Sequence, residues 1–307
     1  MDQLLNLDGI LHIELLGGQA RALLMRSTSM VEAARRTHQT SRVATAALGR
    51  MMTATALMAV SLKGEKNRLS VTIKGDGPLG TMIAAANAQC DVKGWVQNPQ
   101  VDLPRRPDGK LAVGDAVGRK GVLTVVKDLG MREPYVGQVN LVSGEIGEDF
   151  AMYFTASEQT PSLVSLGVLT SQTVESAGGL IVQMLPGADE AAIRSVEMSA
   201  PMFENISRTL KDMTLEEAAK DLFSHLEMRV LESRVPRFRC DCSRERMEKA
   251  LISLGRAELT QMIDEARKGI DVERDGTIAL MCQFCRRSRR FTADDLQALL
   301  DQAVSPT

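Results

Sequence analysis

Residues 41–74 read SRVATAALGRMMTATALMAVSLKGEKNRLSVTIK and combine two different hydrophobic patterns. From residue 41 to residue 62, small and apolar side chains occupy nearly every helical face, which predicts a helix buried on several sides. After Lys63 and Gly64, apolar and polar residues alternate over residues 69–74, which is the period of a half-buried strand. A buried helix followed by a strand indicates a mixed α+β fold.

The flanking sequence extends this pattern. Further short strands are predicted at residues 92–97, 122–127, 138–143 and 152–156, separated by Gly, Asp, Asn and Pro clusters. Upstream, Ser29 and Glu32 have the spacing of a capping box, so we expect a helix to begin there. Because Leu185-Pro186-Gly187 marks a break, we predict an α/β N-terminal domain over residues 1–184.

Two smaller segments are predicted after this domain. Residues 189–233 have helical patterns, with a second capping box at Thr214 and Glu217, and this segment is acidic. Beyond Pro236 the local charge becomes basic, which indicates another boundary. We therefore predict a helical middle segment or linker at 185–236 and a small C-terminal module at 237–307.

Within the C-terminal module, the sequence predicts short helices and a hairpin. Ser243 and Thr292 stand where N-caps are expected, and Gly255 where a helix should end. Asp275-Gly276 lies between two alternating runs, at residues 270–274 and 277–281, and is typical of a hairpin turn.

Composition restricts the classes of function. The chain has 307 residues, a net charge of −2 and 3% aromatic residues, so it has no overall electrostatic bias toward nucleic acid or anionic membranes. The longest uncharged apolar run, residues 51–62, is shorter than a spanning helix, and the N-terminus lacks the pattern of a signal peptide. We expect a cytoplasmic protein. The 17 methionines indicate either core filling or an adaptable binding surface.

Familiar catalytic motifs do not account for the sequence. Residues 75–80 match the G-x-G-x-x-G dinucleotide pattern, but the short distance to the next strand favours a turn over a phosphate-binding crossover. His12, His38 and His225 are far apart in the sequence and belong to no known catalytic motif. We therefore expect that the protein is not an enzyme.

Four cysteines near the end of the chain form the strongest motif. Cys240 and Cys242 form a C-x-C pair, and Cys282 and Cys285 form a C-x-x-C pair. Four thiolates in two close pairs favour one Zn²⁺ per chain, with an iron–sulfur cluster or unrelated structural cysteines as alternatives. The fifth cysteine, Cys90, is expected to be a small buried side chain.

The same cysteines are expected to react with oxidants as well as to bind a metal. A module of this size with few aromatic residues has a thin core, so metal binding should supply most of its stability. Zinc-bound thiolates are deprotonated, which is the form that oxidants attack. A disulfide between Cys240 and Cys242 needs a bent backbone, and strained disulfides are the labile kind.

These motifs, together with several others along the chain, resemble those of the heat shock protein 33 family, the redox-regulated 33 kDa chaperonin. The resembling stretches are Cys240-Asp241-Cys242-Ser243-Arg244-Glu245-Arg246, Cys282-Gln283-Phe284-Cys285, Gly77-Pro78-Leu79-Gly80, Val125-Val126-Lys127-Asp128-Leu129-Gly130 and Ser157-Glu158-Gln159-Thr160-Pro161-Ser162. The resemblance covers essentially the whole chain.

The resemblance implies an ATP-independent holdase chaperone that is inactive when reduced and zinc-bound. It implies that oxidation pairs Cys240 with Cys242 and Cys282 with Cys285, releases zinc, unfolds the module and loosens the middle segment. The activated form, usually a homodimer, would protect unfolded or oxidatively damaged client proteins from aggregation. The implied fold is an α/β chaperone domain, a helical linker and a zinc module with four cysteine ligands.

Two other interpretations of the same cysteines are a nucleic-acid-binding zinc ribbon and a zinc enzyme. A zinc ribbon with four cysteine ligands and nearby arginines can bind nucleic acid, although the overall acidity and the few aromatic residues weigh against it, and we expect neither nucleic acid nor membrane as a partner. A zinc enzyme is disfavoured because four Cys ligands leave no open coordination position for a substrate.

Overall fold

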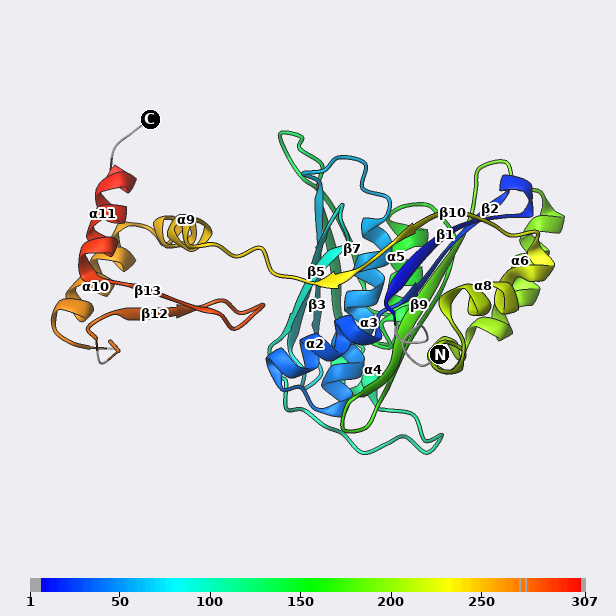
Figure 1. Ribbon diagram of the computed structural model, residues 1–307, viewed down its shortest axis with the longest axis horizontal. Helices are drawn as coiled ribbons and strands as arrows, with labels where there is room; N and C mark the ends of the chain where they lie inside the picture. The colour runs from blue at the N-terminus through cyan, green and yellow to red at the C-terminus, as the bar shows by residue number, and fades with distance from the viewer. Residues whose placement is uncertain (1–6, 271, 274, 305–307) are drawn as a thin grey trace. The chain divides into compact units, whose positions relative to one another are not determined.

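The computed structural model describes residues 7–270, 272–273 and 275–304. The chain divides into two compact units, Met1–Arg239 and Cys240–Thr307, both of which contain helices and strands (Figure 1). The mixed α+β fold class predicted from the sequence is therefore confirmed. None of the described helices combines the length and the apolar character needed to cross a bilayer.

The first unit is built on two sheets. One has the strand order β10-β1-β2-β9-β8 and is antiparallel throughout. The other has the order β11-β5-β4-β3-β6-β7 and is antiparallel except where β11 joins β5. The strands of the first sheet are β1 (Gly9–Leu15), β2 (Ala20–Arg26), β8 (Ser162–Thr170), β9 (Val174–Met184) and β10 (Arg229–Arg234). Those of the second are β3 (Arg68–Gly75), β4 (Thr81–Asn87), β5 (Asp91–Val96), β6 (Gly121–Asp128), β7 (Tyr135–Asn140) and β11 (Arg237–Phe238).

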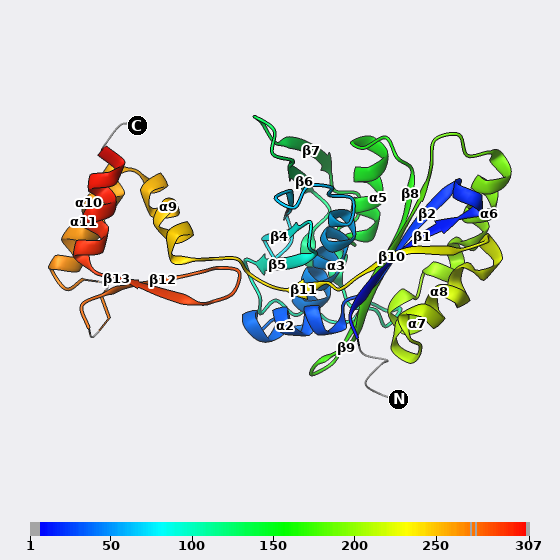
Figure 2. The same cartoon turned by 45° about the horizontal axis from the view of Figure 1, so that its top comes forward.

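Helix α3 (Arg42–Ala59) lies between the two sheets, as both views show (Figures 1 and 2). Ser41 caps it by accepting a hydrogen bond from the Ala44 amide at 3.1 Å. Nearly all its residues are buried because one face packs on each sheet, and α2 (Thr28–His38) and α4 (Val113–Val117) add to the same core. The predicted helix, buried on several sides, is confirmed.

Helices α6 (Glu190–Phe203), α7 (Ile206–Asp212) and α8 (Leu215–Phe223) cover the other face of the first sheet. Leu11, Ile13 and Leu24 of β1 and β2 form a separate core with Leu222 and Phe223. The predicted capping box is present, since the Thr214 hydroxyl accepts the Glu217 amide proton and the Glu217 carboxylate accepts the Thr214 amide proton.

Residues 229–239, at the end of the middle region, form a segment that we call the edge strap. The prediction of helix through residue 233 is wrong here, because Arg229–Arg234 pairs with β1 as β10. Five of the six residues of β10 are exposed, and a free sheet edge supplies the hydrogen bonds that a helix would otherwise make. The strap then joins the second sheet, where the Arg237 and Arg239 amides donate to the carbonyls of Cys90 and Val92.

Two other local predictions are wrong. Residues 152–156 are helical, because they lie in α5 (Gly147–Ala156), whose start is fixed by the Asp149 carboxylate accepting amide protons from Val142 and Ile146. Helix α2 begins at Thr28, and its first-turn amides at Ser29 and Met30 donate to Asp8, far away in sequence. Residues 75–80 form a turn between the antiparallel strands β3 and β4, as expected.

The second unit contains helices α9 (Arg244–Leu254), α10 (Arg256–Arg267) and α11 (Ala293–Val304) and strands β12 (Ile278–Met281) and β13 (Ser288–Phe291). The predicted caps at Ser243 and Thr292 are present, as is the helix end at Gly255. The predicted turn at Asp275-Gly276 is present, since the Glu273 amide donates to Thr277 O at 2.8 Å and the Gly276 amide to Glu273 O at 2.9 Å. The strand that follows it, β12, pairs with β13, so the predicted pairing with the run before the turn is wrong. Of the run at residues 270–274, Asp271 and Arg274 lie outside the described residues.

Candidate metal centre

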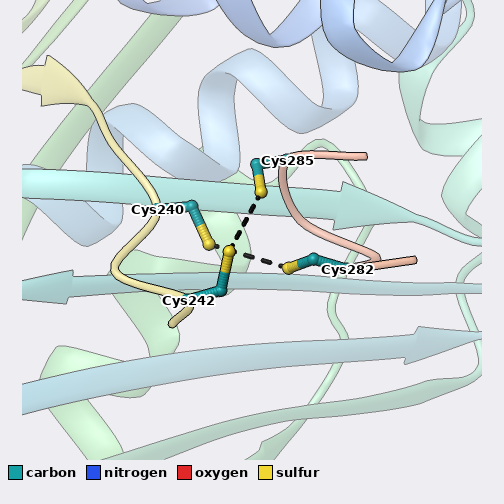
Figure 3. Close-up of side chains that lie close together, drawn as sticks. All are labelled: Cys240, Cys242, Cys282 and Cys285. Carbon is teal, nitrogen blue, oxygen red and sulfur yellow. Dashed lines mark hydrogen bonds between the residues drawn. The ribbon is translucent and has the colours of Figure 1, made fainter. Parts of the chain in front are cut away.

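The four cysteines near the end of the chain lie on two short loops of the second unit (Figure 3). Cys240 and Cys242 are in the extended segment that leads to α9, and Ser243 caps that helix directly after them. Cys282 and Cys285 are in the tight turn between β12 and β13. This turn is closed by the Cys282 amide donating to Arg287 O at 3.0 Å and the Arg286 amide donating to Cys282 O at 2.8 Å.

The sulfur atoms of the two loops point toward one another. Cys240 Sγ lies 3.7 Å from Cys282 Sγ, and Cys242 Sγ lies 3.3 Å from Cys285 Sγ (Figure 3). All four sulfurs lie within 4.8 Å of one another, and all four cysteines are free thiols. A tetrahedral metal with bonds near 2.3 Å to sulfur separates its ligands by roughly 3.8 Å. The four cysteines therefore fit one metal ion.

The acid–base properties of the sulfurs also favour a cation. Burial raises the pKa of Cys240, and the neighbouring Cys282 and Cys285 raise it further. Burial likewise raises the pKa of Cys242 to about 11. At Cys282, burial acts to raise the pKa. Hydrogen bonds from the backbone amides of Cys285 and Phe284, together with those from the Cys240 and Cys285 side chains, outweigh burial and lower the pKa. Four thiolates this close need a positive charge between them.

Several arginines near the cysteines bind carboxylates. Arg246 pairs with Asp241, and Arg290 with Asp275 at 2.8 Å. Arg244 contacts Glu248 and Asp295 at 2.9 Å and lies 4.4 Å from the centre of the Phe291 ring. Arg244 therefore connects α9 to α11 and to the β12–β13 hairpin.

The other residues singled out from the sequence lie away from this cluster. Cys90 is fully buried in the first unit, as expected, and burial raises the pKa of its thiol. His225, in the 3-10 turn after α8, shares a hydrogen bond of 2.7 Å with the Ser199 hydroxyl and so connects that turn to α6. His12 lies in β1 and His38 at the end of α2.

Comparisons with known proteins cover both units. Residues 8–292 match the family model described as Hsp33 protein. The chain belongs to the Hsp33 family. A 33 kDa chaperonin of Desulforamulus reducens is 48% identical over 286 residues, which cover 92% of this chain and 94% of that protein. A 33 kDa chaperonin of Clostridioides difficile is 44% identical over 287 residues, covering 93% and 96%.

A solved structure agrees with this assignment. The crystal structure of the 33 kDa chaperonin (heat shock protein 33 homolog) from Thermotoga maritima matches with a TM-score of 0.83 and 33% identity, covering 97% of this chain and 99% of that one. Membership of the Hsp33 family supports a chaperone role, which implies that the protein binds client proteins.

The sequence patterns did not reveal one buried group that connects the middle helices to the first sheet. Arg26, at the end of β2, is 1% exposed, and its Nη2 donates to the carbonyls of Leu210, at 2.6 Å, and Met213. Its Nε and Nη1 have no hydrogen-bond partner in the described structure. An arginine that ends the apolar run Ala22-Leu23-Leu24-Met25 of β2 was the only available signal.

Proposed function

We propose that the protein is a redox-regulated, ATP-independent holdase chaperone that holds one Zn²⁺ through Cys240, Cys242, Cys282 and Cys285 in its reduced form. The observation that carries the proposal is the meeting of the four free sulfurs within 4.8 Å in a member of the Hsp33 family. A bound Zn²⁺ would keep the four sulfurs deprotonated and hold the two loops together.

The small core of the second unit supports a switch. Its buried apolar residues are few, and the two cysteine loops join its helices to its hairpin. We propose that an oxidant such as hydrogen peroxide converts Cys240 with Cys242, and Cys282 with Cys285, into disulfides. Each pair of zinc-bound thiolates gives two electrons to one peroxide, which takes up two protons from the solvent and is reduced to two molecules of water. Zinc then has no ligands, and the module unfolds.

The proposal assigns three roles along the chain. Residues 1–184 form the chaperone domain, residues 185–236 the helical linker that loosens on oxidation, and residues 237–307 the redox module. The activated form is proposed to be a cytoplasmic homodimer that protects unfolding and oxidatively damaged proteins. It performs no catalysis in this proposal, because four cysteine ligands leave no open coordination position at the metal.

A nucleic-acid-binding ribbon receives less support. Arg244, Arg246 and Arg290, which sequence patterns placed near the cysteines, already pair with carboxylates. Arginines that neutralise acidic side chains contribute little to phosphate binding.

The test combines zinc release with light scattering of an unfolding client. Peroxide with mild heat should release about one zinc per chain and turn on suppression of aggregation. Cys240→Ser should abolish stoichiometric zinc binding in the reduced protein, whereas Cys90→Ala, at the buried cysteine of the first unit, should leave it intact. An oxidised wild-type protein that lost its zinc but never suppressed aggregation would refute the chaperone switch.

A further inference from the structure

The second sheet of the first unit ends in an open strand, β7. The Leu141 amide donates to Gly121 O at 2.9 Å, and this bond shows which backbone groups of β7 face β6. In an antiparallel pair these groups alternate, so Tyr135, Gly137 and Val139 bond toward β6. The N–H and C=O groups of Val136, Gln138 and Asn140 therefore point away from the sheet.

This edge lacks the usual protection. Natural edge strands carry charged residues, proline or bulges that prevent pairing with another chain. The sequence of β7 is Tyr-Val-Gly-Gln-Val-Asn, without a charge or a proline, and its pairing with β6 is regular. Strand β7 is thus a competent template for one more strand.

A groove runs beside this edge. Its volume is about 580 Å³, and it lies between β7 with the residues after it and helix α5. Helix α5 comes this close because position 137 is glycine, where a Cβ would lie 2.4 Å from Ser157 Oγ and 2.9 Å from the Tyr153 ring. The residues that line the groove are uncharged: Gln138, Val139, Asn140, Leu141, Val142, Met152 and Ala156.

Large apolar side chains are exposed around the groove. Val142 and Met152 line it, with exposed fractions of 49% and 41%, and Val136 beside it is 57% exposed. Tyr135 and Met131 extend this surface along the β6–β7 end of the sheet. A strand edge beside a helix, with apolar pockets between them, is the arrangement by which several peptide-binding domains take an extended chain.

We propose that this groove binds an extended, uncharged apolar segment of a non-native protein, which adds to β7 as a further strand. The nature of the partner rests on the proposed chaperone function. An uncharged lining favours an uncharged occupant, because a charged side chain would lose hydration there without a counter-charge. The flexible Met152 side chain adapts to segments of different shape.

A second copy of the chain fits this edge less well. Antiparallel pairing of two β7 strands places a two-fold axis perpendicular to the sheet, so both α5 helices come to the same face. Because α5 already borders the groove, the two helices would compete for the space beside the new strand. A single extended segment brings no such helix.

The groove and the four cysteines lie in different units of the chain. The groove lies within Met1–Arg239, and those cysteines lie in Cys240–Thr307. Because the proposed chaperone is active after oxidation, peptide binding is measured on the oxidised protein. An oxidised protein that suppresses client aggregation without protection of β7 by the peptide would refute the groove alone, so the two proposals fail separately.

The experiment uses the full-length protein after treatment with peroxide and a fluorescent peptide with eight alternating Val and Thr residues flanked by lysines. Hydrogen exchange resolved by residue is measured with and without the peptide. Exchange should slow at least ten-fold at Val136, Gln138 and Asn140, because their amides become bonded. Protection confined to α6, or absent from β7 at saturating peptide, would overturn the proposal.

Two variants and one altered peptide sharpen the test. Gln138→Pro removes an outward amide that the sheet does not use, and Met152→Glu places a charge in the groove; each should weaken peptide binding roughly ten-fold. Gln138→Thr and Met152→Leu are the matched controls and should bind nearly as the wild type does. The same peptide with every amide of its apolar run N-methylated should also bind at least ten-fold more weakly.

Equal binding of the methylated peptide would show recognition without strand addition and refute the proposal. Met198→Glu changes an exposed apolar side chain elsewhere in the first unit, on α6, and should not affect peptide affinity. If protection of the three β7 amides instead rises with protein concentration in the absence of peptide, the occupant is a second copy and the client proposal is wrong.

Discussion

At the scale of single residues, Arg26 is the buried group on which the docking of the middle helices depends most directly. Replacing it with alanine should lower the free energy of unfolding by about 3 kcal/mol, because a cavity forms and the carbonyls of Leu210 and Met213 lose their donor. Urea denaturation measures the total loss of unfolding free energy, and hydrogen exchange should show that the loss of amide protection is concentrated in α7.

The matched control lies on the same strand. Arg21 is partly exposed and donates to Gln183 Oε1 at 3.0 and 2.7 Å. Arg21→Ala should cost only about 1 kcal/mol, because water can replace the lost bonds. Equal losses for Arg21→Ala and Arg26→Ala would contradict the special role of the buried guanidinium.

Asp8 gives the first unit a pH dependence. Burial raises the pKa of its carboxyl to about 6, against the hydrogen bonds that it accepts from Ser29 and Met30. Since the pKa in the folded state is above that in the unfolded chain, this group favours folding at low pH, and the contribution is lost as the pH rises through 6. The loss should be roughly 2 kcal/mol.

Asp8→Asn isolates this effect. Urea denaturation at pH 4.5, 5.5, 6.5 and 7.5 should show the difference in stability between wild type and variant changing across this range and then levelling off. A difference that stays constant with pH would mean that Asp8 titrates normally.

The roles of Asp8 and Arg26 could not be predicted from the sequence. Their hydrogen-bond partners are more than 20 and 180 residues away, respectively.

At the scale of helices and strands, the cap of α8 controls a helix that covers the first sheet. Thr214→Ala removes the acceptor of the Glu217 amide and should destabilise α8 by about 1 kcal/mol. Faster hydrogen exchange in Leu215–Phe223 would report this. Thr260→Ala, in the interior of α10, removes a hydroxyl that bonds only within its helix, and it should leave α8 unchanged.

Local signals predicted some elements well and others poorly. The caps at Thr214, Ser243 and Thr292 were predicted because each bonds to an amide three residues away. Residues 152–156 of helix α5 were predicted as a strand, because their aromatic and β-branched side chains resemble strand residues when the anchoring of the helix start by Asp149 is not visible. Strand β10 was missed because it depends on the open edge of β1.

At the scale of the whole molecule, the metal should stabilise one unit only. Chelation of zinc from the reduced protein should abolish amide protection in α9, α10 and α11, because the core of Cys240–Thr307 contains few large buried residues. Protection in α3 should persist, since its core is formed entirely by the first unit. Simultaneous loss in both units would show that they fold as one.

The meeting of the four cysteines could be predicted from the sequence, whereas the groove beside β7 could not. The spacing of the cysteines predicted the loops that bring the four sulfurs together, because short pairs leave few alternatives. The groove beside β7 could not be predicted, since it depends on the order of strands in a sheet and on the approach of α5 to Gly137.

The edge strap has a mechanical consequence. Strand β11 joins the second sheet over only two residues, and the backbone bonds described there are those from Arg237 to Cys90 and from Arg239 to Val92. A force applied to the chain beyond residue 239 loads these two bonds before any others in the first unit. The pull then passes to β10, which has one neighbouring strand. Traction from the C-terminal side should therefore strip one edge strand from each sheet before it reaches the helix between the sheets.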